Sequence, residues 1–534
     1  MSKLPISNST KDSTVLTKAG SHILSFLSAP NLASARVVDR GFHEAVQDLR
    51  LADKQTVITG SLELWRRSFP NARCINLTGR ILADADFVHL RGLLHVCLDE
   101  TRGFTDAAFS HLTGVQTLSL IRCTAPLTDA TLAHITGVKS LNISYTSIPF
   151  TDAGLAHLRG IKEFIMQGCR EIVISDAGLA HLVGIKKLDI DGYSNPTLTD
   201  AAFEPLCDQR VGVGLEELDI GRCKQFTEEV CRSFRNIKKL SITCLEFTEA
   251  ALEPLESIDT LDIGLCGKIT SLSALSGRVK HLNMRFCSLL NPEELVHLRG
   301  IESLDLSFCT QVGDEHLSHL VGIKKLSLEH CTQTTLTHAA FAPLAPSLKV
   351  LNIAWCRQGT IGDRAFQHFG GLEELNMGVC NGPEYTDACL GMIPRVKKLD
   401  IHACYQLTPL AIQNLARSNQ VIEEIYLGSN PNVWLTWQGV LHRDLVEEAG
   451  RFLASRASRR ATPARVYDPC SGSGPSGPPP PPPNAWPRGP PRGSDGTWPR
   501  GPPRGSDGTW PRGPPRERRS RRKAKKSRRS TKKN

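Results

Sequence analysis

The chain has 534 residues, of which 40% are hydrophobic, and its formal net charge is +10. Residues 516–534 hold twelve Lys or Arg and one Glu, a charge of +11, which leaves about −1 for residues 1–515. Any inference drawn from positive charge therefore applies to this final segment alone. No run of eighteen apolar residues occurs, so neither a membrane span nor a membrane partner is expected.

Residues 12–50 predict a small helical head. Apolar residues at helical spacing begin at Ile23, stop at Ala29-Pro30 and resume at Leu32. Together with Val38-Asp39-Arg40-Gly41-Phe42, this pattern resembles a divergent F-box. That family docks on a Skp-type adaptor and, through it, on a cullin–RING ubiquitin ligase. The resemblance implies that eight residues divide between the adaptor groove and the core of the head: Ile23, Leu24, Phe26, Leu27, Leu32, Val37, Val38 and Phe42.

The head departs from the F-box pattern at two places. Leu4-Pro5 lies about ten residues earlier than the family's opening Leu-Pro, and Asp39 and Phe42 stand where Cys and Trp are usual. The alternative is a plain helical cap that shields the first repeat of the body that follows.

From residue 71 to residue 433 a nine-residue motif recurs sixteen times, at intervals of 21 to 30 residues. Val115-Gln116-Thr117-Leu118-Ser119-Leu120-Ile121-Arg122-Cys123 is one copy. Self-similarity at this period means stacked units that bury their apolar faces only against one another. Ten copies place Cys at the ninth position: Cys123, Cys169, Cys223, Cys266, Cys287, Cys309, Cys331, Cys356, Cys380 and Cys404.

Each unit divides into two halves of different period. The first half, such as Ile185-Lys186-Lys187-Leu188-Asp189-Ile190, alternates like a short half-buried strand. The second half begins with a Thr or Ser that suits a helix N-cap, usually followed by an acidic residue that suits the positive helix end. These residues are Thr105, Thr128, Thr151, Ser175, Thr199, Thr227, Thr248, Thr337, Thr386 and Thr408.

Residues 71–433 resemble the cysteine-containing subtype of the leucine-rich repeat, as in Leu304-Asp305-Leu306-Ser307-Phe308-Cys309. The resemblance implies an α/β fold, a right-handed solenoid of about sixteen β-α units. Because helices are wider than the spacing of strands, the strands are expected on the inside of an arc and the helices on the outside.

The recurring cysteine is interpreted as a small buried group and weak donor at the turn after the strand. A histidine also recurs near the end of the helical half, and duplication of a surface residue explains it better than a metal site does. These histidines are His89, His111, His134, His157, His181, His297 and His319.

Motif positions three, five and seven are expected to face the open side of the sheet, because strand side chains alternate. Position three changes sign between units, as in Lys187, Glu217 and Lys239, which favours lateral ion pairs. Position five is acidic or small and polar, and a column of carboxylates there would attract a basic segment of a partner. The candidate partner-binding residues at this position are Asp219, Asp262, Asp305 and Asp400.

Position eight carries a mostly apolar stripe from Leu265 to Val379. Packing between successive turns is one explanation, and anchoring of a ligand is the other. The candidate partner-binding residues of the stripe are Phe286, Phe308, His330 and Trp355.

After the repeats, residues 434–455 predict an amphipathic helix that caps the last unit. Residues 456–534 are rich in Pro, Gly and Arg and predict a disordered tail. The basic cluster within 516–534 is typical of a nuclear signal or of weak, salt-sensitive contact with nucleic acid.

No nucleotide-binding loop, nucleophile motif, metal-ligand set or C-x-x-C pair occurs, so we expect no enzyme, no cofactor and no metal. The N-terminus lacks the apolar core of a secretion signal, which favours a reducing intracellular compartment, cytoplasm or nucleus. The first hypothesis is the substrate-recognition subunit of a Skp–cullin–F-box ubiquitin ligase that holds an unknown protein substrate. The alternatives are a repeat scaffold or inhibitor without ligase coupling, and an RNA-associated nuclear factor.

Overall fold

The computed structural model describes residues 55–208, 214–427, 434–436 and 451. The predicted head at 12–50, with its eight adaptor-facing candidates from Ile23 to Phe42, lies outside the described residues. The same holds for the predicted tail at 456–534.

The described residues form one sheet in which each strand pairs with the strand of the next repeat. Sixteen strands are parallel and in register, so that the apolar residue at motif position four lies opposite its equivalent in the next strand, as Leu282 lies opposite Leu304. Each strand spans motif positions three to five. The strands are β1 Cys74–Asn76, β2 His95–Cys97, β3 Thr117–Ser119, β4 Ser140–Asn142, β5 Glu163–Ile165, β6 Lys187–Asp189, β7 Glu217–Asp219, β8 Lys239–Ser241, β9 Thr260–Asp262, β10 His281–Asn283, β11 Ser303–Asp305, β12 Lys325–Ser327, β13 Val350–Asn352, β14 Glu374–Asn376, β15 Lys398–Asp400 and β16 Glu424–Tyr426.

Short helical segments return the chain from each strand to the next. The α-helices are α4 Leu62–Ser68, α5 Asp129–His134, α6 Asp152–Leu155, α7 Asp176–Ala180, α8 Glu204–Cys207, α9 Asp314–Leu317, α10 Gly362–Phe366 and α11 Pro409–Ser418. The 3-10 helices are η1 Asp84–Leu90, η2 Asp106–His111, η3 Ala156–Leu158, η4 Asp200–Phe203, η6 Glu228–Phe234, η7 Glu249–Ala251, η8 Ser273–Leu275, η9 Pro292–Leu298, η10 Ser318–Leu320, η11 His338–Phe341 and η12 Cys389–Met392.

Many of these returns are 3-10 rather than α-helical, because each has room for only one or two turns before the chain must re-enter the sheet. Tighter winding is common in such short pieces. Glycines in the left-handed region end several of them, for example Gly114 at φ 86° and Gly160 at φ 83°. The histidines that recur on these segments, such as His89 and His111, lie in their last turns.

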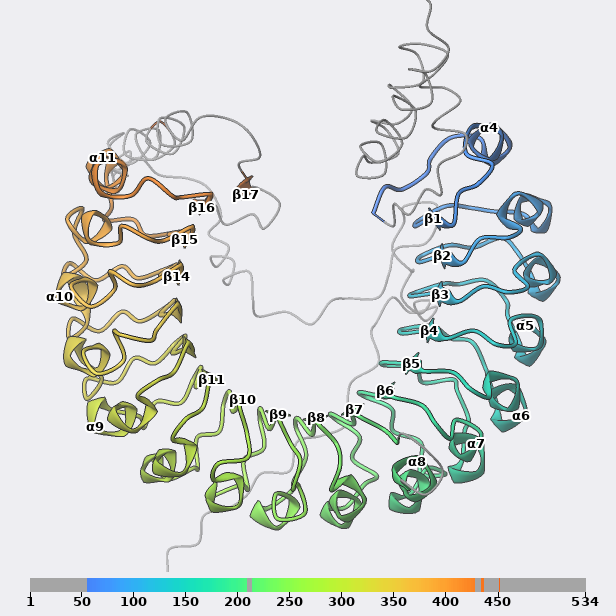
Figure 1. Cartoon of the computed structure of the whole chain (residues 1–534), viewed down its shortest axis with the longest axis horizontal. Helices are drawn as coiled ribbons and strands as arrows, with labels where there is room; N and C mark the ends of the chain where they lie inside the picture. The colour runs from blue at the N-terminus through green and yellow to red at the C-terminus, as the bar shows by residue number, and fades with distance from the viewer. Residues whose placement is uncertain (1–54, 209–213, 428–433, 437–450, 452–534) are drawn as a thin grey trace, which may run out of the picture. The chain divides into compact units, whose positions relative to one another are not determined.

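The strands line the inner side of the arc and the helical segments the outer side, with the core between them (Figure 1). The side chains at positions four and six point into this core: Leu304 is 1% exposed and Leu306 is completely buried. Phenylalanines of the outer segments, such as Phe341, fill it from the other side. The described chain is therefore the leucine-rich-repeat solenoid that its sequence resembles.

The N-terminal end of the core is covered by α4. Leu62, Trp65 and Phe69 are buried against the first repeat. The hydroxyl of Ser61 accepts a hydrogen bond from the backbone of Leu64 and caps the helix. The free edge of β1 is met by a parallel bridge between Val57 and Asn76.

The predicted capping helix at 434–455 does not begin at residue 434. Trp434–Thr436 forms strand β17, which pairs antiparallel with β16. An edge strand presents unpaired N–H and C=O groups, and a returning strand satisfies them. Residues 437–450 and 452–455 lie outside the described residues, and Arg451 is helical.

No helix among the described residues is long and apolar enough to cross a membrane.

Candidate functional site

The cysteines at motif position nine form a ladder of sulfur–carbonyl hydrogen bonds. From Cys169 to Cys404, nine of these thiols donate to the position-six carbonyl of the preceding repeat over 3.0–3.3 Å. Burial raises the pKa of the Cys356 thiol to about 12. The structural interpretation of these cysteines is confirmed, since each is buried and nine of the ten thiols donate a hydrogen bond at the turn after the strand.

The Thr-Asp pairs on the outer side form a second ladder. The Thr151 hydroxyl accepts from the Ala153 backbone N–H and donates to the carboxylate of Asp129 in the preceding repeat. The same carboxylate accepts the Thr151 backbone N–H over 2.9 Å. The predicted N-caps are confirmed at most of these positions, and the acidic residue also joins one repeat to the next.

The Asp or Asn at motif position five closes the turn after the strand. Its side-chain oxygen accepts a hydrogen bond from the backbone N–H two residues later. Asp219 accepts from Gly221 over 2.9 Å, and Asp305 accepts from Ser307 over 2.8 Å. Asn352 does the same for Ala354 over 3.0 Å. The acidic column thus has a structural role in which the amide and the carboxylate are interchangeable.

Opposite charges at position three pair across neighbouring strands, as predicted. Lys239 lies 2.6 Å from Glu217, and Lys398 lies 3.5 Å from Glu424. These pairs are exposed, so each contributes at most about 1 kcal/mol. They set the charge pattern of the concave face more than its stability.

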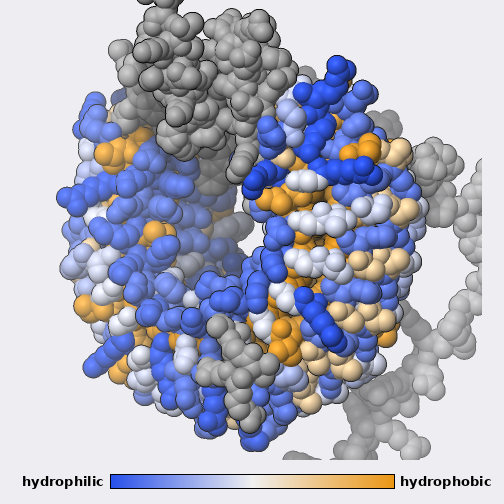
Figure 2. All heavy atoms as spheres, turned by 45° about the vertical axis from the view of Figure 1, so that its right-hand side comes forward, coloured by the Kyte–Doolittle hydropathy of each residue, from blue (hydrophilic) through white to orange (hydrophobic). Residues whose placement is uncertain are grey.

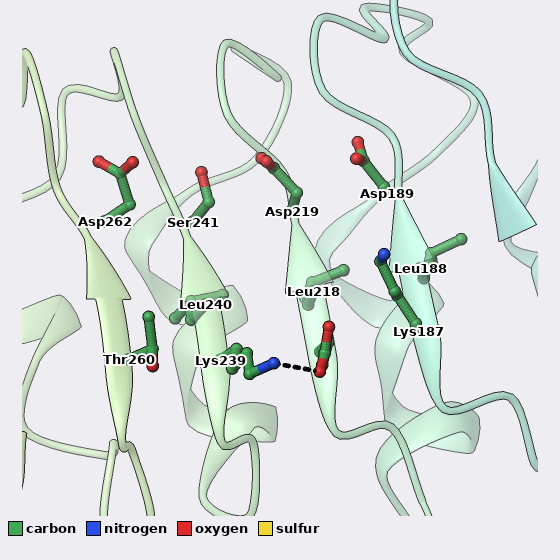
Figure 3. A pocket seen from close by; sticks show the side chains of 11 residues that line it. Lys187, Leu188, Asp189, Leu218, Asp219, Lys239, Leu240, Ser241, Thr260 and Asp262 are labelled. Carbon is green, nitrogen blue, oxygen red and sulfur yellow. Dashed lines mark hydrogen bonds and ion pairs between the residues drawn. The ribbon is translucent and has the colours of Figure 1, made fainter. Parts of the chain in front are cut away.

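Side chains from β6 to β9 line one hollow of this face (Figure 3). Asp189, Asp219, Ser241 and Asp262 lie in a row where the strands end, and Lys239 reaches Glu217 nearer their beginning. Burial, reinforced by the charge of Asp189, raises the pKa of Asp219 to about 6. Burial also raises the pKa of Asp189 and of Asp262.

The backbone at position eight is left-handed in repeat after repeat. Phe308, His330 and Trp355 have φ between 61° and 64°, and even the β-branched Val379 has φ 64°. A non-glycine residue in this region costs roughly 1–2 kcal/mol. The conformation lets the position-eight N–H donate to the next repeat, as from Phe308 to the Glu329 carbonyl over 2.8 Å.

Because that backbone pairing continues from repeat to repeat, the position-eight side chains stack. The ring centroids of Phe286 and Phe308 lie 4.1 Å apart, those of Phe308 and His330 4.6 Å, and those of His330 and Trp355 5.5 Å. The planes are within 19° of parallel. We call these four residues the aromatic ladder.

Two arginines lie on the aromatic ladder. The Arg285 guanidinium lies 4.7 Å from the Phe308 ring centroid, and that of Arg357 lies 4.6 Å from the centroid of Trp355. Cation–π attraction of this kind holds the guanidinium against the ring. Neither arginine was predicted as a site residue, because the stack that places them depends on the left-handed backbone.

The same column continues toward the N-terminus with different side chains. Arg122 lies 5.5 Å from the Tyr145 ring centroid. A methyl group on Gly168 would lie 2.8 Å from that ring, so the glycine makes room for it. Position eight thus accepts glycine, cation or aromatic ring without change of fold.

The predicted site residues are brought together only in part. The four members of the aromatic ladder are contiguous. The carboxylates divide among three hollows: Asp219 and Asp262 line one, Asp262 and Asp305 a second, and Asp400 a third. Figure 2 shows a mostly hydrophilic surface with narrow hydrophobic patches between polar bands.

In the described part of the chain, no group of three or more His, Cys, Asp or Glu side chains is placed to hold a metal ion.

No family model matches the chain, and no curated protein matches it. Solved structures resemble it at low identity. A chain of the TLR13–ssRNA13 complex has TM-score 0.48 and 19% identity over 68% of this chain, which spans 57% of that chain's length. A chain of the Rad7–Elc1 complex of yeast has TM-score 0.38 and 15% identity, and the match covers 82% of this chain and 98% of that chain. A chain of the mouse RP105/MD-1 complex has TM-score 0.41 and 14% identity, and the match covers 68% of this chain and 67% of that chain. These likenesses concern the fold alone.

Proposed function

We propose that this protein is the substrate-recognition subunit of a Skp–cullin–F-box ubiquitin ligase. Its repeat body holds a protein substrate, and its head at residues 12–50 docks on the Skp-type adaptor. The body performs no chemistry. It raises the effective concentration of the bound protein near the ubiquitin carrier.

The observation that carries the recognition role is the surface formed by the strands and the turns after them. It is continuous from β1 to β16, and it presents mostly polar side chains at positions three and five. Beside them lies the aromatic ladder, whose end members Phe286 and Trp355 are exposed. An extended surface of this kind suits a macromolecular partner. The described hollows along it are shallow and open, unlike the enclosed sites that hold small molecules.

The N-terminal end of the solenoid supports the ligase half of the proposal. A plain cap is the alternative interpretation of residues 12–50, but Val57 and α4 already cover the first repeat. Ile58 donates to the Asn76 carbonyl over 2.8 Å, and Trp65 is only 7% exposed. The first repeat thus already has a cover within the described residues, which supports the F-box interpretation of the head over a plain cap.

Co-purification with a Skp-type adaptor tests the proposal. The full-length chain is expected to retain the adaptor, and a Phe26→Asp, Phe42→Asp double variant is expected to lose it. Trp355→Ala, on the repeat body, is the matched control and should retain it fully. If the wild type fails to bind the adaptor, the protein is a scaffold without ligase coupling. If the double variant still binds it, the F-box interpretation of residues 12–50 is wrong.

A further inference from the structure

We propose that the aromatic ladder, with Arg357 and Lys325, binds an extended acidic segment of the partner protein. The segment carries a large apolar side chain among Asp or Glu residues. This inference rests on the proposed role of the repeat body as the substrate holder, and it does not require coupling to a ligase.

The aromatic ladder is not needed to fold the repeats. Its motif position is occupied by Gly79, Gly168 and Gly192 in other repeats, all in the same left-handed conformation. Phe286 remains 39% exposed and Trp355 38% exposed. Large rings at a strained and exposed position favour a role in binding over one in packing.

The carboxylates near the ladder already have hydrogen-bond donors from the protein itself. Asp262 accepts from the Gly264 backbone over 2.9 Å and from the Asn283 amide over 2.9 Å. Asp305 accepts from both the backbone and the hydroxyl of Ser307.

Glu329 is occupied in the same way. It lies 3.5 Å from the Arg285 guanidinium and accepts from the Asn352 amide over 3.4 Å. A basic segment would therefore compete with existing donors throughout these repeats.

The cations in this region keep donors free. Among the residues the structure describes, Arg357 has the Trp355 ring but no carboxylate partner, and Lys325 has none either. The cross-strand neighbours of Lys325 are the uncharged Ser303 and Val350. Formal charges balance over residues 279–357. Beside the aromatic ladder, however, the described carboxylates Asp262, Asp305 and Glu329 have donors, whereas Arg357 and Lys325 have no carboxylate, so this part of the surface complements an acidic partner. This is the reverse of the basic partner that the acidic column predicts.

The dimensions suit an extended segment. The aromatic ladder crosses three repeat spacings of about 4.8 Å, or about 14 Å in all. A strand rises about 3.3 Å per residue, so four or five residues of the partner span it. An apolar side chain in the middle would contact the ring edges, while a flanking carboxylate reaches Arg357. Lys325 lines the concave hollow five residues before His330, so a carboxylate beyond the four or five residues on the ladder would meet it.

Selection from a phage-displayed library of random decapeptides against the full-length protein tests the inference. Enriched peptides should combine Asp or Glu with Trp, Phe or Leu. Fluorescein-labelled copies should bind about tenfold more weakly to Trp355→Ala and to Arg357→Glu. Replacing the peptide acids by lysine should restore binding to Arg357→Glu. Tyr145→Ala is the matched control, because it removes an exposed aromatic ring from the same motif position outside the aromatic ladder, and it should bind like the wild type.

Enrichment of Lys- or Arg-rich peptides, no enrichment, or equal binding by Trp355→Ala would overturn the inference. Retention of single-stranded poly-U that Trp355→Ala abolishes would overturn it in favour of nucleic acid. Adaptor retention is measured on the same preparations. A protein that keeps the adaptor but binds no acidic peptide refutes this inference alone, and one that binds the peptide but no adaptor refutes only the ligase role.

Discussion

Where motif position five is Asp or Asn, one side-chain oxygen closes the turn after the strand, and a charge is not required for it. Asn142, Asn283, Asn352 and Asn376 make the same hydrogen bond as their aspartate equivalents. Asp219 therefore carries a charge that its turn does not need. Burial and the nearby Asp189 disfavour that charge.

Asp219→Asn is expected to stabilise the protein at pH 7.5 by about 1–2 kcal/mol, because it keeps the turn and removes the buried charge. The folded pKa of Asp219, about 6, lies above its unfolded value of about 4. The wild type therefore loses stability as pH rises through this window, and the loss is complete above it. Thermal unfolding midpoints at pH 4 and pH 7.5 check this, and the two proteins should nearly coincide at pH 4.

Asp259→Asn supplies a control of opposite sign. A hydrogen bond from Lys280 lowers the pKa of Asp259, so this variant should lower the midpoint at pH 7.5. An equal effect of Asp219→Asn at both pH values would show that charge is not its cause.

At the scale of the element, the outer segments are held to one another by their first residues. Each Thr-Asp pair caps its own turn and binds the next one, so a carboxylate serves the repeat that follows it. Asp129 accepts twice from Thr151, and Asp152 accepts twice from Ser175. Short segments that are marginal alone gain order from this ladder.

Asp129→Ala is expected to leave the backbone N–H and hydroxyl of Thr151 without their acceptor. The loss of two hydrogen bonds to a charged group should destabilise α6 by about 2 kcal/mol. Hydrogen exchange over residues 151–158 measures it, and Asp129→Asn should lose less because an acceptor remains. Glu171→Ala, at an exposed position between the repeats, is the neutral control. Faster exchange spread evenly over all repeats would contradict a local ladder.

The strands and caps could be predicted from the sequence because each repeats at a fixed place in a periodic motif. The burial of Leu304 and the cap at Thr151 follow from alternation and from residue type alone. The 3-10 conformation of many outer segments could not be predicted, since it depends on how much room the chain has between one strand and the next. The hydrogen bond from Thr151 to Asp129 could not be predicted either, because it joins residues that are 22 positions apart.

The candidate site was predictable only in its residue types. The stripe from Phe286 to Trp355 is visible in the sequence, but its stacking requires the left-handed backbone at position eight. The arginines that lie on it, Arg285 and Arg357, are at different motif positions and share no pattern. The sequence predicted one column of carboxylates that would attract a basic partner. Sequence periodicity does not show which of these carboxylates already accept hydrogen bonds within the protein.

At the scale of the whole repeat body, one sheet runs through the described repeats, and both of its ends are covered. The bridge at Val57 and helix α4 cover one end, and β17 covers the other with reversed strand direction. In such an array each repeat contacts mainly its neighbours, so stability is approximately a sum of local terms. Damage at one end should therefore stay near that end.

Trp65→Ala is expected to test this locality. Truncating a buried Trp costs about 3–5 kcal/mol, and here the loss falls on the cap and the first repeats. Hydrogen exchange should accelerate at β1 and β2 and remain unchanged at β10 to β13. Leu64→Ala, on the exposed face of the same helix, should change neither region. Equal acceleration at β10 to β13 would mean that the repeats unfold as one unit.

The Thr-Asp ladder also bears on how this chain could have grown. From Asp84 to Thr248 each repeat offers a carboxylate to its successor and takes one from its predecessor, as Asp152 serves Ser175 while Thr151 relies on Asp129. A duplicated gene segment that encodes one whole repeat would insert with every one of these hydrogen bonds satisfied on both sides. A segment that is one residue too long or too short would break them all at the join. Selection for the ladder therefore favours evolution by whole repeats, and it lets the binding surface lengthen without the invention of a new core.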